Sequence, residues 1–217
     1  MSAYQLEELN KYLDKMLAER IIFPRKSPAG APILVVATPD GRLPLCVDYC
    51  QLNKLTILNT HPLPLMTELR ERGARATIFT KLELKDAYHL LPSKIEGEWK
   101  TAFHSRYGHY EYQVRPVGLL NAPATLQAMM NTILREFLDY GVVLYLDDIL
   151  IDSKTMEEHE ALVKQVLARL ERYDLALSLK KCVFHVNTVE FLVYIVGQSG
   201  ITMRAKKVES NLNGEAP

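Results

Sequence analysis

Apolar side chains recur at steps of three and four over the first twenty positions, which is the spacing of one face of an α-helix. We expect an amphipathic helix across residues 4–20. Its apolar face consists of Leu6, Leu9, Leu13, Met16 and Leu17. Prolines and glycine between residues 24 and 32 then break the helical pattern.

Two apolar runs separated by turn-forming residues predict a β-hairpin. The first run covers residues 33–38, the turn lies at residues 39–41, and the second run covers residues 43–49. Pro44 has no N–H group to donate to a strand ladder. The second strand should therefore be an edge strand or contain a bulge.

The next stretch combines a connector with two β elements. Residues 50–75 are typical of a surface connector with a short helical piece at Met66–Arg72. Residues 76–83 are rich in β-branched and aromatic side chains and predict a strand. A second hairpin is expected from residues 99–103 and 110–114.

Regular alternation of elements follows toward the C-terminus. A helix should begin at Asn121, extend to Phe137 and end before Gly141. Two short strands, residues 142–146 and 149–152, are separated only by two aspartates.

A further helix opens with the capping box of residues 155–158 and carries apolar positions up to Leu170. A final strand pair is expected at residues 175–179 and 189–196. A polar tail ends the chain.

The order of these elements predicts an α+β fold. From residue 76, with residues 99–114 treated as an insertion, the order is strand, helix, strand, strand, helix, strand. This order is typical of the split βαβ, or ferredoxin-like, arrangement with an antiparallel sheet. Its first and third strands are antiparallel neighbours, so Glu83 should lie beside Asp147 and Asp148.

Three converging carboxylates repel one another unless a cation neutralises them. Oxygen ligands in an open site suit Mg²⁺, and a pair of such ions serves phosphoryl transfer. The alternative is that Asp147 and Asp148 are ordinary turn residues in solvent, because turns favour aspartate. The apolar strands on both sides of the pair favour the metal site.

Composition limits the class of protein. The chain has 217 residues, of which 48% are hydrophobic and 24% charged, as in globular proteins. Its first residues are too charged for a secretory signal, and no apolar run approaches the ~20 residues of a membrane span. We therefore expect an intracellular, cytoplasmic protein without a membrane partner, with a nucleus or organelle still open.

Charge and cysteine usage add two constraints. The 26 basic and 26 acidic residues balance, whereas a nucleic-acid binder usually carries a basic excess. Cys46, Cys50 and Cys182 show neither disulfide nor zinc-site spacing. We expect them to be small core residues.

Eight short motifs occur in order along the chain. They are L-C-V-D-Y (45–49), L-N-K-L-T (52–56), P-L-P-L (62–65), F-T-K-L-E-L (79–84), E-W-K-T-A-F (98–103), R-Y-G-H-Y-E-Y (106–112), G-L-L-N-A-P-A-T-L-Q (118–127) and Y-L-D-D-I-L-I (145–151). Together they resemble the reverse transcriptase of gypsy-like long-terminal-repeat retrotransposons. The similarity extends from about residue 6 to about residue 208.

The resemblance implies a right-hand polymerase, in a truncated or degenerate copy. Such an RNA-directed DNA polymerase extends a primer on an RNA or DNA template with deoxynucleoside triphosphates (dNTPs) and Mg²⁺ or Mn²⁺. The fingers would be residues 1–75 and 87–116, the palm residues 76–86 and 117–209, and the tail residues 210–217. No thumb or RNase H domain is expected, and the oligomeric state stays open.

The resemblance also implies roles for individual residues. Glu83, Asp147 and Asp148 match the catalytic metal ligands. The dNTP-binding positions would be Arg42, Asp86, Ala87, Tyr88 and Val117, where Asp86 and Ala87 contribute backbone N–H groups and Tyr88 excludes a 2′-hydroxyl. The template or primer positions would be Gln127, Tyr145 and Val193.

Several matching positions depart from the family pattern. Glu83 stands where the family has aspartate, and a displacement of about 1 Å in such a site can cost on the order of 10²-fold in rate. Pro39 and Pro44 replace cations of the fingers, and Arg42 is the nearest substitute. Cys50, Val117 and Val193 replace an arginine, an aromatic residue and a glycine.

Three functions remain under consideration. The leading one is an RNA-directed DNA polymerase whose activity is weakened by these departures. The second is a catalytically inactive module that binds nucleic acid or protein. The third is another metal-dependent enzyme with a similar core, such as a nucleotidyl cyclase, although a cyclase has no need of the motifs at residues 45–49 and 52–56.

Overall fold

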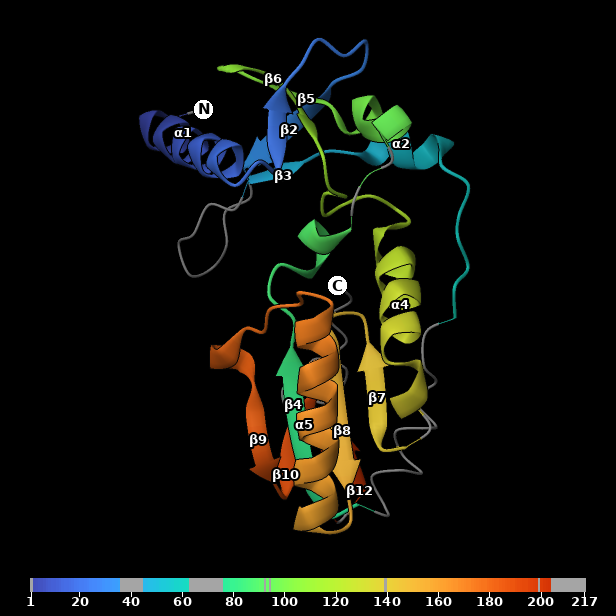
Figure 1. The fold of residues 1–217 in the computed structure, drawn as a ribbon. Helices are drawn as coiled ribbons and strands as arrows, with labels where there is room; N and C mark the ends of the chain where they lie inside the picture. The colour runs from blue at the N-terminus through green and yellow to red at the C-terminus, as the bar shows by residue number, and fades with distance from the viewer. Residues whose placement is uncertain are drawn as a thin grey trace. The chain divides into compact units, whose positions relative to one another are not determined.

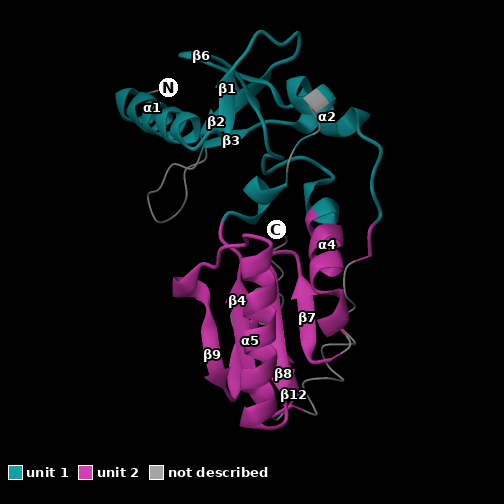
Figure 2. Ribbon diagram, in the orientation of Figure 1, with its two compact units in different colours: residues 1–60, 86–125 teal, residues 61–85, 126–217 magenta. Residues whose placement is uncertain are grey.

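The computed structural model describes residues 2–35, 45–62, 76–91, 93, 95–138, 140–198 and 200–203. The chain forms two compact units of mixed α and β structure, residues 1–60 with 86–125 and residues 61–85 with 126–217 (Figure 2). Within the described part of the chain, no helix is long and apolar enough to cross a membrane.

A five-stranded mixed sheet organises the first unit (Figure 1). Its strand order is β1-β6-β5-β2-β3. Its strands are β1 (Ile22–Pro24), β2 (Ala31–Val35), β3 (Leu45–Val47), β5 (Phe103–Ser105) and β6 (Gly108–Tyr112). All neighbours are antiparallel except β2 and β5. The antiparallel β2–β3 pair confirms the first predicted hairpin; its turn, with Pro39, Arg42 and Pro44, lies outside the described residues.

The predicted N-terminal helix is confirmed as α1 (Ala3–Ala18). Ser2 and Gln5 form a reciprocal capping box at its start. Its buried residues Leu9, Leu13 and Met16 belong to the same apolar core as the sheet residues Phe103 and Tyr112.

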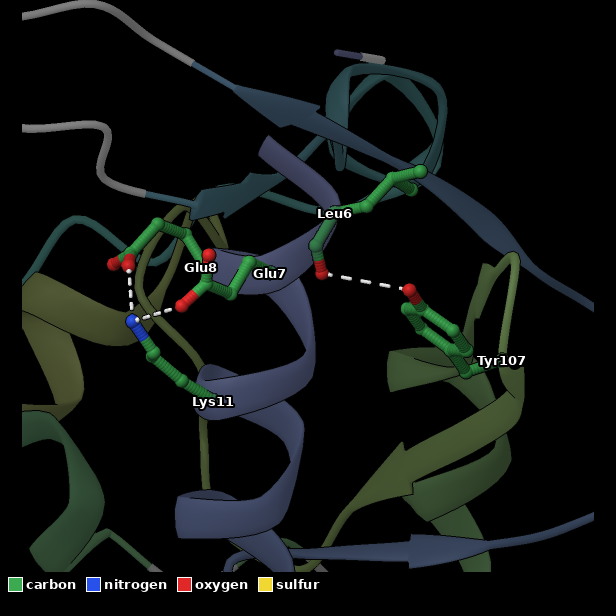
Figure 3. Close-up of polar contacts among 5 residues, drawn as sticks. All are labelled: Leu6, Glu7, Glu8, Lys11 and Tyr107. Atoms are coloured by element: carbon green, nitrogen blue, oxygen red, sulfur yellow. Dashed lines mark hydrogen bonds and ion pairs between the residues drawn. The ribbon is translucent and has the colours of Figure 1, made fainter. Parts of the chain in front are cut away.

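Polar contacts lie on the exposed part of helix α1. Lys11 Nζ contacts Glu7 at 2.9 Å and Glu8 at 3.0 Å, while the Tyr107 hydroxyl donates to the Leu6 carbonyl at 3.5 Å (Figure 3). The lysine contacts are solvent-exposed pairs within one helix, so water and salt screen them and they add little to stability. The apolar face therefore holds the helix in place.

Three expectations for the first unit are wrong in detail. Cys46 and Cys50, expected as small core residues, are exposed. The expected strand at residues 99–103 is mostly a 3₁₀ helix, η2 (Ile95–Thr101), because the Thr101 hydroxyl donates to the Glu98 carbonyl at 2.7 Å and accepts from the Tyr112 N–H at 2.9 Å. The expected connector contains a short helix, α2 (Cys50–Leu55). The helical piece expected at Met66–Arg72 lies outside the described residues.

A four-stranded antiparallel sheet forms the centre of the second unit, in the order β7-β8-β4-β9. Its strands are β4 (Ile78–Glu83), β7 (Val142–Tyr145), β8 (Asp148–Ser153) and β9 (Val183–Val186). Strands β4 and β8 are antiparallel neighbours, which confirms the adjacency expected of the first and third strands.

Each face of this sheet packs on a different partner. Helix α5 (Met156–Arg172) lies over β4 and β8 (Figure 1), and its buried His159 contacts Thr80. Phe79 on the opposite face joins an apolar core with a second sheet. That sheet consists of β10 (Thr188–Phe191), β11 (Tyr194–Gly197) and β12 (Gly200–Met203).

Helix α4 (Ala122–Ile133), which continues as η3 (Arg135–Phe137), confirms the helix expected from Asn121.

The expected C-terminal strands are wrong in position. Residues 175–179 form only an isolated bridge, Leu177 with Leu84, before the 3₁₀ helix η4 (Leu179–Lys181), and β9 pairs with β4 instead. The expected strand at residues 189–196 is divided at Leu192, whose φ of 58° belongs to a turn. Strands β10 and β11 therefore form a hairpin.

Candidate active site

The three candidate carboxylates lie at one end of the β4–β8 pair. Glu83 is opposite Asp148 in the strand register, and the Leu84 N–H donates to the Asp147 carbonyl at 2.9 Å. Directly opposed residues of an antiparallel pair point to the same face of the sheet. The structure thus brings together, at backbone level, the residues that the sequence predicts as catalytic.

A lysine of the same strand contacts one of these carboxylates. Lys81 precedes Glu83 by two positions on β4, so both side chains share one face and Lys81 is a diagonal neighbour of Asp148. Its Nζ lies 3.0 Å from Asp148 Oδ1, and the two side chains are 18% and 20% exposed. Burial raises the pKa of Asp148, and Lys81 partly opposes this shift.

A second lysine reaches the site from the other side of β4. The Ser178 N–H donates to the Glu83 carbonyl at 2.9 Å, which fixes the chain beside the end of β4 just before η4. The last residue of η4 is Lys181, and its ammonium donates to Glu83 Oε1. This hydrogen bond, with the nearby Glu83 charge, raises the pKa of Lys181.

The turn that carries the aspartates has a strained backbone and is held by hydrogen bonds from a buried side chain of helix α4. Leu146 has φ of 55°, a left-handed conformation that costs a non-glycine residue about 1–2 kcal/mol. The Gln127 side chain, only 1% exposed, accepts from the Leu146 N–H at 2.7 Å and donates to the Leu144 carbonyl at 3.2 Å. Asn131 in turn accepts from Gln127 at 2.9 Å.

Gln127 therefore holds the β7–β8 turn, a role that the sequence reasoning missed. Beside its place in the motif at residues 118–127, the sequence signal is a polar residue three positions before Met130 and seven before Leu134, on the apolar face of the helix. A direct contact of Gln127 with template or primer stays a prediction.

The donor chemistry fits a hard divalent cation, since all three candidate ligands are carboxylates. However, the described residues contain no gathered group of three or more His, Cys, Asp or Glu side chains that could hold an ion. Two of the carboxylates instead contact Lys81 and Lys181.

The other predicted site residues are divided between the units. Ala87 and Tyr88 lie in the 3₁₀ helix η1 (Ala87–Leu90) of the first unit, after Asp86, whose φ is 49°. Val117 is 64% exposed in the same unit. In the second unit, Tyr145 pairs with Asp148, and Val193 follows Leu192 in the β10–β11 turn. Arg42 lies outside the described residues.

The first unit also contains a cavity of about 1020 Å³. Its lining is mostly apolar and also includes the aromatic, amide and basic side chains of Tyr49, Asn53, Trp99, Lys100 and Arg115. Trp99 is 42% exposed, so part of its ring is accessible from solvent. Such a lining can contact a nucleobase and a phosphate group at once.

Residues 38–196 match the family described as "Reverse transcriptase (RNA-dependent DNA polymerase)". The Tf2-3 and Tf2-7 transposon polyproteins of Schizosaccharomyces pombe are each 38% identical to this chain over 213 residues. These matches cover 98% of this chain and 16% of each relative. The chain thus spans about one sixth of the length of these curated relatives.

Three solved structures of foamy viral enzymes have a fold similar to that of this chain. A foamy viral protease-reverse transcriptase in complex with an RNA/DNA hybrid aligns with a TM-score of 0.87 and 22% identity, over 100% of this chain and 29% of that chain. A second structure, in complex with double-stranded DNA, has a TM-score of 0.85 and 24% identity, over 96% and 37%. The native prototype foamy virus enzyme has a TM-score of 0.77 and 28% identity, over 85% and 25%.

Proposed function

The chain belongs to the reverse transcriptase family, and from this we propose that it forms the fingers and palm of an RNA-directed DNA polymerase. It would extend a primer on an RNA or DNA template with dNTPs. The first unit would serve as the fingers, and the second unit, with its four-stranded sheet, as the palm. The observation that carries the proposal is the register of Glu83 opposite Asp148, with Asp147 in the adjoining turn.

Glu83, Asp147 and Asp148 would hold Mg²⁺ or Mn²⁺. When bound, such ions activate the attacking hydroxyl and neutralise charge on the phosphates. The residues of the chain would perform the positioning. Gln127 fixes the turn that presents the aspartates, and Lys81 orients Asp148.

The nucleotide and nucleic-acid contacts follow from the family resemblance. Backbone N–H groups at Asp86 and Ala87 would bind the triphosphate, and Tyr88 would contact the sugar. Tyr145 and Val193 would lie toward the primer. Foamy viral relatives solved with double-stranded DNA and with an RNA/DNA hybrid support nucleic acid as the partner.

Primer extension tests this proposal directly. Purified protein would be incubated with an RNA template, a DNA primer, dNTPs and Mg²⁺ or Mn²⁺, beside Asp147→Asn and Glu83→Asp variants. The proposal predicts extension that Asp147→Asn abolishes. If Glu83 is a poor substitute for aspartate, Glu83→Asp increases the rate by up to about 10²-fold, because it restores the shorter ligand. Extension that survives Asp147→Asn would contradict the assigned site.

A second candidate function is a catalytically inactive module that binds nucleic acid. Glutamate at position 83 and the lysine contacts of two candidate ligands favour it. This function predicts that the protein binds a template–primer duplex while no variant incorporates a nucleotide. The two measurements, binding and extension, separate the candidates.

A further inference from the structure

Both opposed carboxylates of the candidate site contact a lysine. Lys81 Nζ lies 3.0 Å from Asp148 Oδ1, and the ammonium of Lys181 donates to Glu83 Oε1. Without these lysines, the two carboxylates would face each other across adjoining strands, where like charges destabilise the pair. The lysines therefore perform a neutralisation that a metal ion would otherwise provide.

We propose that Lys181 is a displaceable internal counterion of Glu83, which competes with a divalent cation for this carboxylate. The proposal rests on the proposed function insofar as Glu83 is taken as a metal ligand. It adds a role for Lys181 that neither the motifs nor the family match assigns. In this role Lys181 acts on the metal affinity of the site.

The two lysines differ in how easily they can move. The Lys81 side chain is 18% exposed and rises from the middle of strand β4, between two paired strands. The Lys181 side chain is 63% exposed and rises from a three-residue 3₁₀ helix. An exposed ammonium on a flexible stem returns to water at low cost. Lys181 is therefore the contact that an incoming cation would displace.

The Glu83 side chain makes the competition effective because it is itself shielded. It is only 15% exposed, and Lys181 already donates to its Oε1, so an ion that takes this oxygen must displace the lysine. An aspartate at this position would be shorter by one C–C bond, about 1.5 Å. The contact with Lys181 thus depends on the residue that departs from the family pattern.

The manganese affinity of the 217-residue chain tests the proposal. Free Mn²⁺ would be measured by electron paramagnetic resonance during titration of the wild type, Lys181→Met and Lys180→Met. Lys180 is the matched control, because it is exposed and adjacent but has no ion pair among the described residues. We expect Lys181→Met to bind Mn²⁺ about fivefold more tightly and Lys180→Met to stay within about twofold of the wild type.

A double-mutant cycle shows whether Lys181 acts through Glu83. In the Glu83→Asp background, we expect Lys181→Met to tighten Mn²⁺ binding by less than about twofold, since the shorter carboxylate no longer reaches the lysine. Circular dichroism would verify that each variant is folded. We expect Lys181→Met to fold as the wild type does, because the replaced side chain is mostly exposed.

The outcomes are distinct. The proposal is overturned if Lys181→Met binds Mn²⁺ no more tightly than Lys180→Met does, or if neither the wild type nor Lys181→Met binds the ion. Equal tightening by Lys181→Met in the wild-type and Glu83→Asp backgrounds would also refute it. If the expected tightening occurs but no variant extends a primer, the polymerase function fails while the counterion role of Lys181 stands.

Discussion

Replacing Gln127 with methionine should loosen the turn that carries Asp147 and Asp148. Methionine has nearly the volume of glutamine, so the change creates little cavity but removes both hydrogen-bonding groups. The Leu146 N–H then loses its acceptor at 2.7 Å, and the Leu144 carbonyl loses its donor at 3.2 Å. A buried polar group without a partner costs about 1–3 kcal/mol.

The expected loss of unfolding free energy is about 2–4 kcal/mol, because two backbone groups are affected and the Leu146 N–H is only partly buried. Urea denaturation measures this loss. Gln165→Met is the matched control, since the same change at an exposed position of helix α5 should alter stability by less than about 0.5 kcal/mol.

Hydrogen exchange adds a local measurement. The Leu146 amide should lose at least about tenfold more protection than amides in the middle of β8, because its acceptor is removed while the strand ladder remains. The reasoning would be refuted if Gln127→Met matched Gln165→Met in stability and left the Leu146 amide protected. Such a result would mean that the β7–β8 turn holds its conformation without Gln127.

Two further predictions concern the stability of the second unit. Gly141 has φ of +86°, and a methyl group there would lie 2.4 Å from the Asp152 carbonyl oxygen, so Gly141→Ala should lower the free energy of unfolding by about 2 kcal/mol or more. Gly200 has φ of +101° and open space around it, so Gly200→Ala should lower it by only about 1 kcal/mol. Urea denaturation measures both losses. Burial, with the nearby His185, lowers the pKa of His159. Just below pH ~6.5 the unfolded chain therefore binds more protons than the folded chain. The free energy of unfolding should fall as the pH drops through that range. An NMR titration that gave His159 a pKa of 6.5 or higher would contradict this expectation.

The long helices and the central strand order were predictable from the sequence because they depend on periodicity and topology. The apolar spacing of α1 and α4 and the capping box of α5 identify these helices, and the order of elements places β4 beside β8. The alternating residues 175–179 were misleading for a physical reason. They lie beside the end of β4 through two backbone hydrogen bonds, from Lys85 to Ala176 and from Ser178 to Glu83, but the chain then turns into η4.

Strand β9 could not be found by the same reasoning. Val183, Phe184 and His185 on this edge strand are all exposed, so no alternation between buried and exposed positions marks it. Short strands of three residues, such as β1, are also below the length at which periodicity is informative. Their positions are set by the partners that they find in the folded sheet.

The carboxylates of the site were predictable and their lysine partners were not. Topology alone places Glu83 beside the aspartates, because the last residue of one antiparallel strand lies next to the first residue of its neighbour. The contact of Lys81 with Asp148 depends on a diagonal position in the register, and that of Lys181 depends on where η4 turns. The spacing of Lys81 and Glu83 puts both on one face of the strand, but which carboxylate each lysine contacts is a property of the three-dimensional arrangement.

The glutamate at position 83 and its lysine partner affect the same carboxylate, so they should be considered together. Glu83→Asp shortens the ligand, and it also weakens the contact with Lys181. A gain in primer extension by Glu83→Asp alone could therefore arise from better ligand geometry or from the loss of a competing cation. Lys181→Met separates the two causes, because it removes the competing ammonium and leaves the length of Glu83 unchanged. If Lys181→Met gains as much activity as Glu83→Asp, charge competition rather than the extra methylene limits this site.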